Sequence, residues 1–292
     1  MKIYYYINTG HRVGLDRLRR SAPIINALEE NGIEVTMLTN DFRAGEYGKE
    51  QFGIKKYISV DTVRNIANVA TPSDVLIFDS QEESRSMWED MASYFHKFIR
   101  ISDNPDDFAL KNEVLLSSMK KIGDAPQVDV VDPRYFVDKE DYNGGIVYFW
   151  GDDDYEQKLL GLSDAFEGLD ITLLEGYYFF LQYGSELSSK FKAMGESENY
   201  DYILMKANKF ITSSPQSAFE ALATGSNPIY LKKPGALDIW DAKMENYGIP
   251  VIYSFDNQII KKKLSEILIY NKKKLRKEAV LGVALYIKDN IS

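Results

Sequence analysis

The sequence predicts an α/β fold in which two Rossmann-like domains face a cleft. Short apolar runs alternate with segments whose apolar residues recur at three- and four-residue spacing, a pattern typical of buried strands followed by amphipathic helices. The pattern pauses once, over the Pro-, Asp- and Gly-rich residues 126–145, and then restarts. A length of 292 residues is about twice that of a usual domain, which agrees with two units.

The first half alternates strand and helix in an order that indicates a parallel sheet covered by helices on both faces. Its apolar runs are short, and the segments between them carry their apolar residues on one helical face. Strands are expected over residues 2–7, 34–38, 74–79 and 97–101, and helices over 18–31, 60–70 and 81–95.

The second half repeats the alternation. We therefore expect one domain over residues 1–143 and another over 144–292, and we leave open whether the C-terminal helix returns to the first domain. Ligands of such sheets bind where strands end in loops, which for two facing domains means the cleft. Strands are expected over residues 145–150, 171–175, 209–214, 227–231 and 250–254, and helices over 155–166, around 186–206, over 215–224, over 236–247 and at the C-terminus.

Composition excludes several classes of protein. A formal net charge of −9 argues against general affinity for nucleic acid, which requires a basic surface. The absence of cysteine excludes disulfides, thiolate zinc sites and a cysteine nucleophile. Apolar runs such as 177–181 are too short for a membrane span of about 20 residues, and the N-terminal run lacks a signal-peptide cleavage site. We expect a cytoplasmic protein.

The C-terminal segment departs from the acidic average. From Asp256 onward it contains nine Lys or Arg residues and four acidic residues. Two interpretations remain open: a solvated helix face, or weak peripheral contact with an anionic membrane or partner.

The loop after the first strand is one candidate binding site. Gly10 and Gly14 would allow a tight turn that directs the amides at the start of a helix toward an anion. The spacing does not fit G-x-G-x-x-G, and Asp16 stands where close backbone approach would favour glycine. As a phosphate loop, this signal is weak.

The stretch "SSPQSAFEALATGSNPIYL", residues 213–231, is a second candidate. Its serines fall at a strand end and a helix start, where Pro215 suits the first helical turn. Glu220, three residues after Ser217, lies on the same helix face and could accept hydrogen bonds from a ribose diol. Helix capping by serine and a nucleoside site are both consistent with the spacing of Ser213, Ser214, Ser217 and Glu220.

These motifs resemble the UDP-sugar hydrolase of pseudaminic acid biosynthesis, in the MurG-like, GT-B-type superfamily. That family opens with a strand and a G-x-G-H-x-x-R loop, followed by a helix that ends in A-L-x-x-x-G, here Ala27, Leu28 and Gly32. The motif's two glycines, histidine and arginine fall without a gap on Gly14, Asp16, Arg17 and Arg20.

The resemblance extends over essentially the whole chain. Residues 211–231 match the segment that holds uridine diphosphate, with Glu220 on the ribose-binding glutamate, and "YFWGDDDYE" stands in place of the second glycine loop, retaining Gly151. Other matched positions are Asp79 at a strand end, Asp103 and Asn104 after the next strand, Tyr135, and Lys139 where arginine is usual.

Two departures bear on catalysis. Arg17 occupies the position of the histidine that positions or activates water in the family, and arginine stays protonated, so it cannot act as a general base. It can bind diphosphate in a bidentate fashion. The second loop has become acidic at residues 152–154, where we weigh helix N-capping by Asp153 or Asp154 against a D-x-D metal site.

The two histidines and an aromatic cluster complete the candidates. His11 either replaces the lost base or is a polar loop residue, whereas His96 is expected to be a partly exposed structural residue. The aromatic residues 176–183 are expected to pack as core, with a tyrosine lining the cleft as the alternative.

The resemblance implies a nucleotide-sugar hydrolase or glycosyltransferase of bacterial surface-glycan or flagellin-glycan biosynthesis. A UDP-sugar substrate would place its nucleotide on residues 144–292 and its sugar or acceptor on residues 1–143; no metal or cofactor is expected, and the oligomeric state is left open. The alternative is a non-catalytic nucleotide-sugar-binding homologue that acts as a sensor or assembly partner. We assign catalysis to Arg17, His11 and Asp79, and substrate binding to Gly14, Arg20, Gly151, Ser213, Ser214, Ser217 and Glu220.

Overall fold

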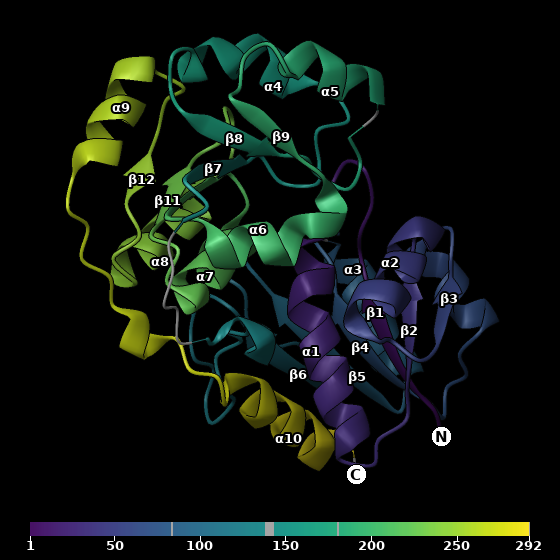
Figure 1. Cartoon of the computed structure of the whole chain (residues 1–292). Coiled ribbons are helices and arrows are strands. Elements are labelled where there is room, and N and C mark those ends of the chain that lie inside the picture. Colours follow the sequence, from purple (N-terminus) through teal and green to yellow (C-terminus); the bar gives the residue numbers. More distant parts are fainter. Residues whose placement is uncertain (83, 138–142, 180, 292) are drawn as a thin grey trace. The chain divides into compact units, whose positions relative to one another are not determined.

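The computed structural model describes residues 1–82, 84–137, 143–179 and 181–291 and divides into two compact units (Figure 1). Unit 1 comprises Met1–Gly10, Arg17–Pro133 and Arg276–Ser292, and unit 2 comprises His11–Asp16 and Arg134–Leu275. Residues His11–Asp16 of the loop after the first strand therefore belong to unit 2, and the C-terminal helix belongs to unit 1. The domain boundary at residue 143 and the cleft stay predictions.

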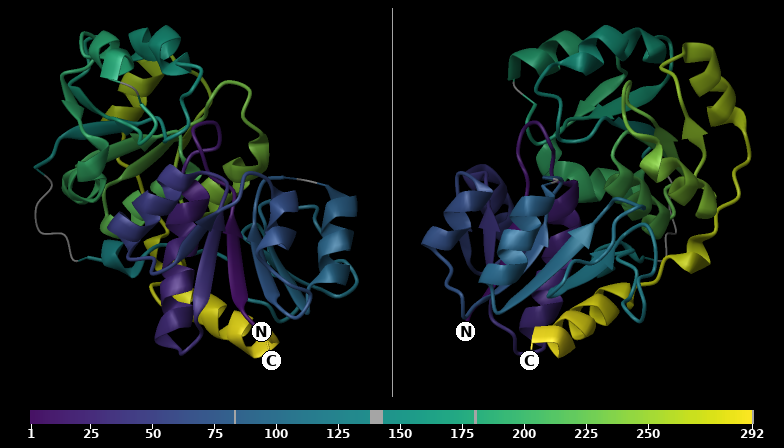
Figure 2. Two further views of the ribbon diagram at one scale, coloured as in Figure 1. Left: turned by 90° about the vertical axis from the view of Figure 1, so that its right-hand side faces the viewer. Right: turned by 180° about the vertical axis from the view of Figure 1, so that it is seen from behind.

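Unit 1 contains a parallel sheet in the order β3-β2-β1-β4-β5-β6, with helices on both faces (Figure 2). Tyr4 and Tyr6 of β1 face one layer of the core, which also contains Met91 of α3. The strands are β1 (Ile3–Ile7), β2 (Val35–Thr39), β3 (Tyr57–Ser59), β4 (Val75–Asp79), β5 (Lys97–Ser102) and β6 (Glu113–Ser117), and the helices are α1 (Asp16–Glu30), α2 (Phe42–Phe52), α3 (Arg85–Tyr94) and α10 (Ala279–Ile291).

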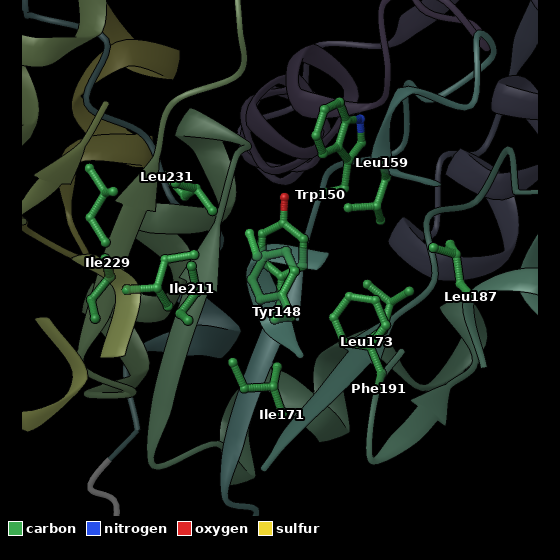
Figure 3. Close-up of a cluster of buried hydrophobic side chains, with 14 of the residues drawn as sticks. Tyr148, Trp150, Leu159, Ile171, Leu173, Leu187, Phe191, Ile211, Ile229 and Leu231 are labelled. Atoms are coloured by element: carbon green, nitrogen blue, oxygen red, sulfur yellow. The ribbon is translucent and has the colours of Figure 1, made fainter. Parts of the chain in front are cut away.

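Unit 2 repeats this arrangement with the order β12-β11-β10-β7-β8-β9, again all parallel. Figure 3 shows the cluster at one face of its sheet, where Tyr148 and Ile211 come from neighbouring strands. The strands are β7 (Ile146–Phe149), β8 (Ile171–Leu174), β9 (Ala193–Gly195), β10 (Lys209–Thr212), β11 (Pro228–Leu231) and β12 (Val251–Ile252), and the helices are α4 (Lys158–Leu162), α5 (Leu181–Leu187), α6 (Tyr200–Lys206), α7 (Pro215–Thr224), α8 (Asp241–Asn246) and α9 (Asn257–Ser265).

The predicted α/β class and pair of Rossmann-like parallel sheets are confirmed. Each strand predicted from an apolar run is present, because these runs form buried strands that pack on both faces. The edge strands β3, β6 and β9 were missed: β3 and β9 have only three residues each, and the apolar run of β6 is limited to Val114–Leu116. Helix α2, whose sequence contains two glycines, was missed as well.

Three predicted helices differ in detail. Residues 60–70 form a 3₁₀ helix at Val63–Asn68, and 155–166 splits into α4 and the 3₁₀ helix Ser163–Phe166. The stretch around 186–206 is interrupted by β9, so it is not one helix. Short apolar segments satisfy helical and strand periods equally, and tertiary packing decides between them. Among the described residues, none of the helices combines the length and apolar character needed to cross a membrane.

Strand register fixes where the loops of each unit meet. In unit 2, Phe149 pairs with Thr212 and with Leu174, so the loops after β7, β10 and β8 all leave the sheet together, at the carboxyl ends of these strands. In unit 1, Ile7 pairs with Asp79, and Asp79 pairs with Ile101, which aligns the ends of β1, β4 and β5. The carboxyl ends of neighbouring parallel strands are where such folds place their functional side chains.

Gly176 gives a test of this packing, because the segment after β8 lies directly against the loop after β7. A Cβ at Gly176 would fall 2.9 Å from the Cα of Asp152 and against the carbonyl oxygen of Gly151, and backbone atoms cannot move aside cheaply. We expect Gly176→Ala to destabilise the protein by about 1–3 kcal/mol in urea unfolding.

Gly161→Ala is the matched control, since a Cβ at that position within α4 meets nothing within 4 Å. It should stabilise the protein by about 0.5–1 kcal/mol, because alanine restricts the unfolded chain and favours the helix. Equal unfolding midpoints for Gly176→Ala and the parent would show that the two loops are not packed as described.

Candidate functional site

The N-terminus of α7 in unit 2 is the first part of the candidate site. Ser213 and Ser214 follow β10, and Ser214 is the N-cap, with extended backbone angles (φ −99°, ψ 120°) and a side chain that accepts the N–H of Ser217 at 3.0 Å. Pro215 follows at the first helical position, where no backbone donor is needed. The capping interpretation of Ser214 is confirmed, and the nucleoside interpretation stays a prediction.

A buried polar cluster continues along the first turns of α7. The hydroxyl of Tyr200 lies 2.6 Å from Oε2 of Glu220 and 2.8 Å from Oγ of Ser217, and the side-chain amide of Gln216 donates to Oε1 of Glu220 at 3.3 Å. Glu220 and Ser217 are fully buried. Buried polar groups in folded proteins are held by hydrogen bonds, and this network holds the carboxylate of Glu220 in a fixed place. Next to this cluster, the hydroxyl of Ser213 forms a 3.1 Å hydrogen bond with the hydroxyl of Tyr148 on β7.

Asp16 supplies a carboxylate to the same helix end. Its Oδ1 accepts the hydroxyl of Ser214 at 2.7 Å, and its Oδ2 accepts the backbone N–H of Gln216 at 3.3 Å. The first N–H groups of a helix lack intrahelical partners and carry partial positive charge, so an anion is stabilised there. Asp16, which sequence comparison marked only as a departure from glycine, is thus an acceptor for the donors at this helix end.

Burial raises the pKa of Asp16 above its usual range, although the hydrogen bond from Ser214 acts in the opposite direction. The carboxylates of Asp153 and Asp152 raise this pKa further, and Lys233 lowers it. The surroundings of Asp16 therefore disfavour additional negative charge.

The acidic loop after β7 is held by internal contacts. Asp152 accepts the N–H of Tyr177 at 2.8 Å, Asp153 pairs with Lys233, and Asp154 accepts the N–H groups of Lys158 and Leu159 at 2.9 and 3.1 Å. Asp154 therefore accepts the first two N–H groups of α4 from outside the helix, whereas the N-cap position is Gln157, which makes no side-chain capping hydrogen bond. Among residues 1–82, 84–137, 143–179 and 181–291, no three His, Asp or Glu side chains are grouped to hold a metal ion.

The two loop glycines of the prediction lie beside Asp153. Gly151 has a φ of 114°, a region that favours glycine, and a Cβ there would lie 2.8 Å from Oδ1 of Asp153 and 3.2 Å from Nζ of Lys233. Gly14 has a φ of 74°, and its Cβ position is 3.5 Å from the Cβ of Asp153. Both glycines are therefore near the helix end, and their role in substrate binding stays a prediction.

His11 lies against aromatic rings of unit 2. Its ring centroid is 4.4 Å from that of Tyr155 and 6.3 Å from that of Tyr178, and the guanidinium of Arg12 lies 5.0 Å from the centre of the Tyr155 ring. Tyr178 is buried, in agreement with the core interpretation of the aromatic cluster. His96 is exposed after the end of α3.

Unit 1 brings Arg17, Arg20 and Asp79 into one cluster with Asp103. Arg20 donates to both oxygens of Asp79, at 3.1 and 2.5 Å, and to Oδ1 of Asp103 at 2.6 Å. Arg17 donates to Asp103 at 3.1 Å, and its Nε lies 3.4 Å from Asp79. The two carboxylates meet because they follow neighbouring strands, β4 and β5, whose ends are in register.

Two serines extend the unit 1 cluster. Ser21 donates to Asp79 at 3.0 Å, and Ser118, which follows β6, donates to Asp103 at 2.5 Å. Sequence reasoning predicted neither serine. Ser21 follows Arg20 but belongs to no motif, and Ser118 follows β6, a strand that was itself missed.

The charges of this cluster balance each other. Burial disfavours the charged forms of Arg20 and Asp103. The carboxylates of Asp103 and Asp79 nevertheless raise the pKa of the Arg20 guanidinium. Likewise, burial alone would raise the pKa of Asp103, but Arg20 and Arg17 hold it well below its usual range. Two guanidinium groups and two carboxylates therefore form an ionic network with no net charge, in which Arg20 and Asp79 are buried and Arg17 and Asp103 are partly exposed.

The sequence-predicted residues thus fall into two groups. Arg17, Arg20 and Asp79 lie together in unit 1, and His11, Gly14, Gly151, Ser213, Ser214, Ser217 and Glu220 belong to unit 2. Their catalytic and binding roles stay predictions. Tyr135 donates a hydrogen bond to Asp201, whereas Lys139 lies outside the described residues. Gln216, Tyr200 and Lys233 were not predicted, because nothing in the local sequence marks them as partners of this helix end.

Comparisons with solved structures identify the fold. The UDP-GlcNAc 2-epimerase of Methanocaldococcus jannaschii, solved with UDP-GlcNAc and UDP, has a TM-score of 0.62 and 9% identity over 99% of this chain and 100% of its own. The spinosyn rhamnosyltransferase SpnG has a TM-score of 0.57 and 12% identity over 100% and 96% of the two chains. The calicheamicin glycosyltransferase CalG4 has a TM-score of 0.54 and 9% identity over 99% and 97%.

No protein-family model matches the sequence, and no curated protein matches it. The structural likeness to epimerases and glycosyltransferases covers both units, so the chain has a GT-B-like two-domain α/β fold.

Asp103 tests the buried network of unit 1. Asp103→Asn would leave Arg17 and Arg20 with one carboxylate, and we expect it to cost about 3–5 kcal/mol of stability at pH 7. Because the folded-state pKa of Asp103 is lowered, its contribution is complete above the unfolded pKa of about 3.9 and is lost as the pH falls further. Urea unfolding from pH 7 to pH 3 should therefore show the gap between the parent and Asp103→Asn narrowing below about pH 4.

Glu34→Gln serves as the control, because Glu34 forms an exposed pair with Lys56 and should leave the unfolding midpoint nearly unchanged. A constant gap between Asp103→Asn and the parent across this pH range would contradict the described network.

Proposed function

We propose that the protein is a nucleotide-sugar enzyme, a hydrolase or glycosyltransferase that acts at the anomeric centre of a UDP-sugar in bacterial surface-glycan or flagellin-glycan biosynthesis. The observation that carries the proposal is the cluster of Ser214, Ser217 and Glu220 at the start of α7, within a GT-B-like fold. The named structural neighbours include a UDP-GlcNAc 2-epimerase and glycosyltransferases, which supports a sugar nucleotide as the ligand.

In this proposal, Glu220 binds the ribose. Its carboxylate is fixed by Tyr200 and Gln216, and ribose hydroxyls would share or displace these hydrogen bonds. A fixed acceptor suits a diol, because two hydroxyls can donate to the two oxygens of one carboxylate. Ser213 and Ser214 would supply hydroxyl groups at the end of the sheet.

The chemical step would involve unit 1. Arg17 and Arg20 would stabilise the negative charge that develops on the diphosphate, and Asp79 or His11 would transfer the proton. Asp79 is fully buried and receives hydrogen bonds from Arg20 and Ser21, which hold its carboxylate in place.

A second candidate function is a non-catalytic nucleotide-sugar-binding homologue that serves as a sensor or assembly partner. The observation that favours it is the balanced cluster in unit 1, where the two arginines already neutralise Asp79 and Asp103. An arginine in place of the family's histidine cannot supply a general base at that position.

Thermal melting with uridine, UDP, UDP-N-acetylglucosamine and CMP separates these functions when it is followed by an assay of nucleotide release. A ligand at a hundred times its dissociation constant should stabilise the protein by about 2.7 kcal/mol. Release of UDP from a stabilising UDP-sugar would support the enzyme, and stabilisation without release would support the non-catalytic homologue. If no nucleotide shifts the melting temperature, both proposals fail.

Glu220→Gln tests the ribose contact at nearly constant shape. We expect it to weaken binding of uridine by about 10- to 100-fold, because a hydrogen bond to a charged group contributes about 1.5–3 kcal/mol. Calorimetric titration measures this loss. Glu198→Gln, an exposed glutamate of unit 2, should bind uridine like the parent. Unchanged binding by a folded Glu220→Gln variant would remove the ribose from this position.

A further inference from the structure

We propose that residues 261–274 of unit 2 form a docking surface for an anionic lipid bilayer, in which Ile267 and Ile269 enter the headgroup region and the flanking lysines contact lipid phosphates. The inference does not depend on the proposed nucleotide ligand, since none of these residues belongs to the candidate site. It selects the bilayer from the interpretations that the charge of the C-terminal segment left open.

The segment places two apolar residues between two lysine triplets. It contains six lysines and one acidic residue, Glu266, in a chain whose formal net charge is −9. Chain geometry limits the Cα separation to about 14 Å between Lys263 and Ile267 and to about 11 Å between Ile269 and Lys272. Each isoleucine is therefore close to one triplet. The lysines are Lys261, Lys262 and Lys263 in α9, and Lys272, Lys273 and Lys274 in the 3₁₀ helix that follows.

Alternate residues fix the segment against unit 2, where it runs along the outside past α8 and β12 (Figure 1). Leu268 packs on the hydrophobic cluster of this unit, and the hydroxyl of Tyr270 donates to a backbone carbonyl of β11 at 3.1 Å. A Cβ at Gly248 would lie 2.5 Å from the carbonyl oxygen of Ile269, so the two backbones are in close contact. The residues between these contacts, Ile267 and Ile269, are 96% and 85% exposed.

Folding does not account for the two isoleucines. Among the described residues they are the most exposed of the large apolar side chains, while Leu268 and Tyr270 already supply the inward contacts. Single exposed apolar residues are common on protein surfaces. Two on one fixed segment, bordered by charged residues, form an apolar patch of the kind that marks an interaction site.

The lysines leave positive charge beside this patch. Lys261, Lys262 and Lys273 are exposed, and within the described ranges they have no ion-pair partner. Lys263 pairs with Glu266 at 2.6 Å, which neutralises the one acidic residue of the segment. An anionic surface would therefore be attracted here, although the protein as a whole is acidic.

The residue types favour a bilayer over a protein partner. Lysine is depleted in protein–protein interfaces, where arginine and aromatic residues are common. Two isoleucines also offer far less area than the about 800 Å² that each partner buries in a stable protein interface. Lysine beside aliphatic residues suits a membrane surface, because the aliphatic side chains reach below the headgroups while the ammonium groups stay at the phosphates.

Co-sedimentation with lipid vesicles tests the proposal. Vesicles of phosphatidylcholine with about a quarter phosphatidylglycerol should bind the parent at least about tenfold more tightly than vesicles of phosphatidylcholine alone. Raising the NaCl concentration from about 50 mM to about 500 mM should weaken this binding, because salt screens exposed charges. Binding to neither kind of vesicle, or equal binding to both, would overturn the inference.

Two combined variants separate the charge from the apolar contact. The triple variant Lys261→Gln, Lys262→Gln, Lys273→Gln should lose about fivefold in affinity for each lysine removed. The double variant Ile267→Ser, Ile269→Ser should lose about tenfold or more, because less apolar surface enters the bilayer. Unchanged binding by the double variant would reduce the effect to general attraction of charge and overturn the inference.

Matched controls come from exposed residues of unit 1. Lys49→Gln, Lys111→Gln, Lys121→Gln removes the same charge, and Phe42→Ser, Phe108→Ser removes two exposed apolar side chains. Both controls should bind the vesicles like the parent, and urea unfolding checks that every variant is folded. A loss in these controls as large as in the matching variants of residues 261–274 would overturn the inference.

Sedimentation velocity without lipid distinguishes a second copy of the chain as the occupant of the patch. The parent and the double variant Ile267→Ser, Ile269→Ser should have the same sedimentation coefficient. An oligomer of the parent that this double variant dissociates would assign the patch to a second copy and overturn the inference.

Discussion

The hydroxyl group of Ser214 connects the parts of unit 2 on which the candidate site depends. It accepts the backbone N–H of Ser217 in the first turn of α7, and it donates to Asp16, so one side chain both caps the helix and holds the loop after β1. Behind it, Glu220 is fixed by Tyr200 and Gln216. These residues meet because the strands β7, β8 and β10 end in register, so that the loops after them lie together at the carboxyl ends of the parallel sheet.

The two units treat charge in different ways. In unit 1, two arginines and two aspartates balance each other inside the protein, and such a network is stable only as a complete set because a lone buried charge is strongly disfavoured. In unit 2, carboxylates outnumber the cation beside them at the start of α7. A GT-B-like fold is compatible with many chemistries, so function depends on these local charges rather than on the architecture.

Sequence reasoning recovered what local pattern determines. The buried strands and the Ser214–Pro215 helix start were predicted because apolar runs and capping residues are local signals. The edge strands β3 and β9 have three residues each, which is too short for a periodic pattern to distinguish them from loops. Sequence reasoning named candidate residues but not their contacts: Asp16 was noted as a departure from glycine, yet its partner Ser214 could be found only in three dimensions. Pairing of Arg17 and Arg20 with Asp103 likewise depends on the register of β4 and β5.

A crystal structure of the protein with saturating UDP is the most direct measurement of the proposed site, because it identifies the acceptor of the Ser214 hydroxyl. We expect the nucleoside to lie against Glu220, with Ser214 bonded either to Asp16 or to a phosphate oxygen, and never to both at once. Nucleotide bound away from α7, or a phosphate on the amide of Gln216 while Asp16 keeps its bond to Ser214, would contradict this description of the site.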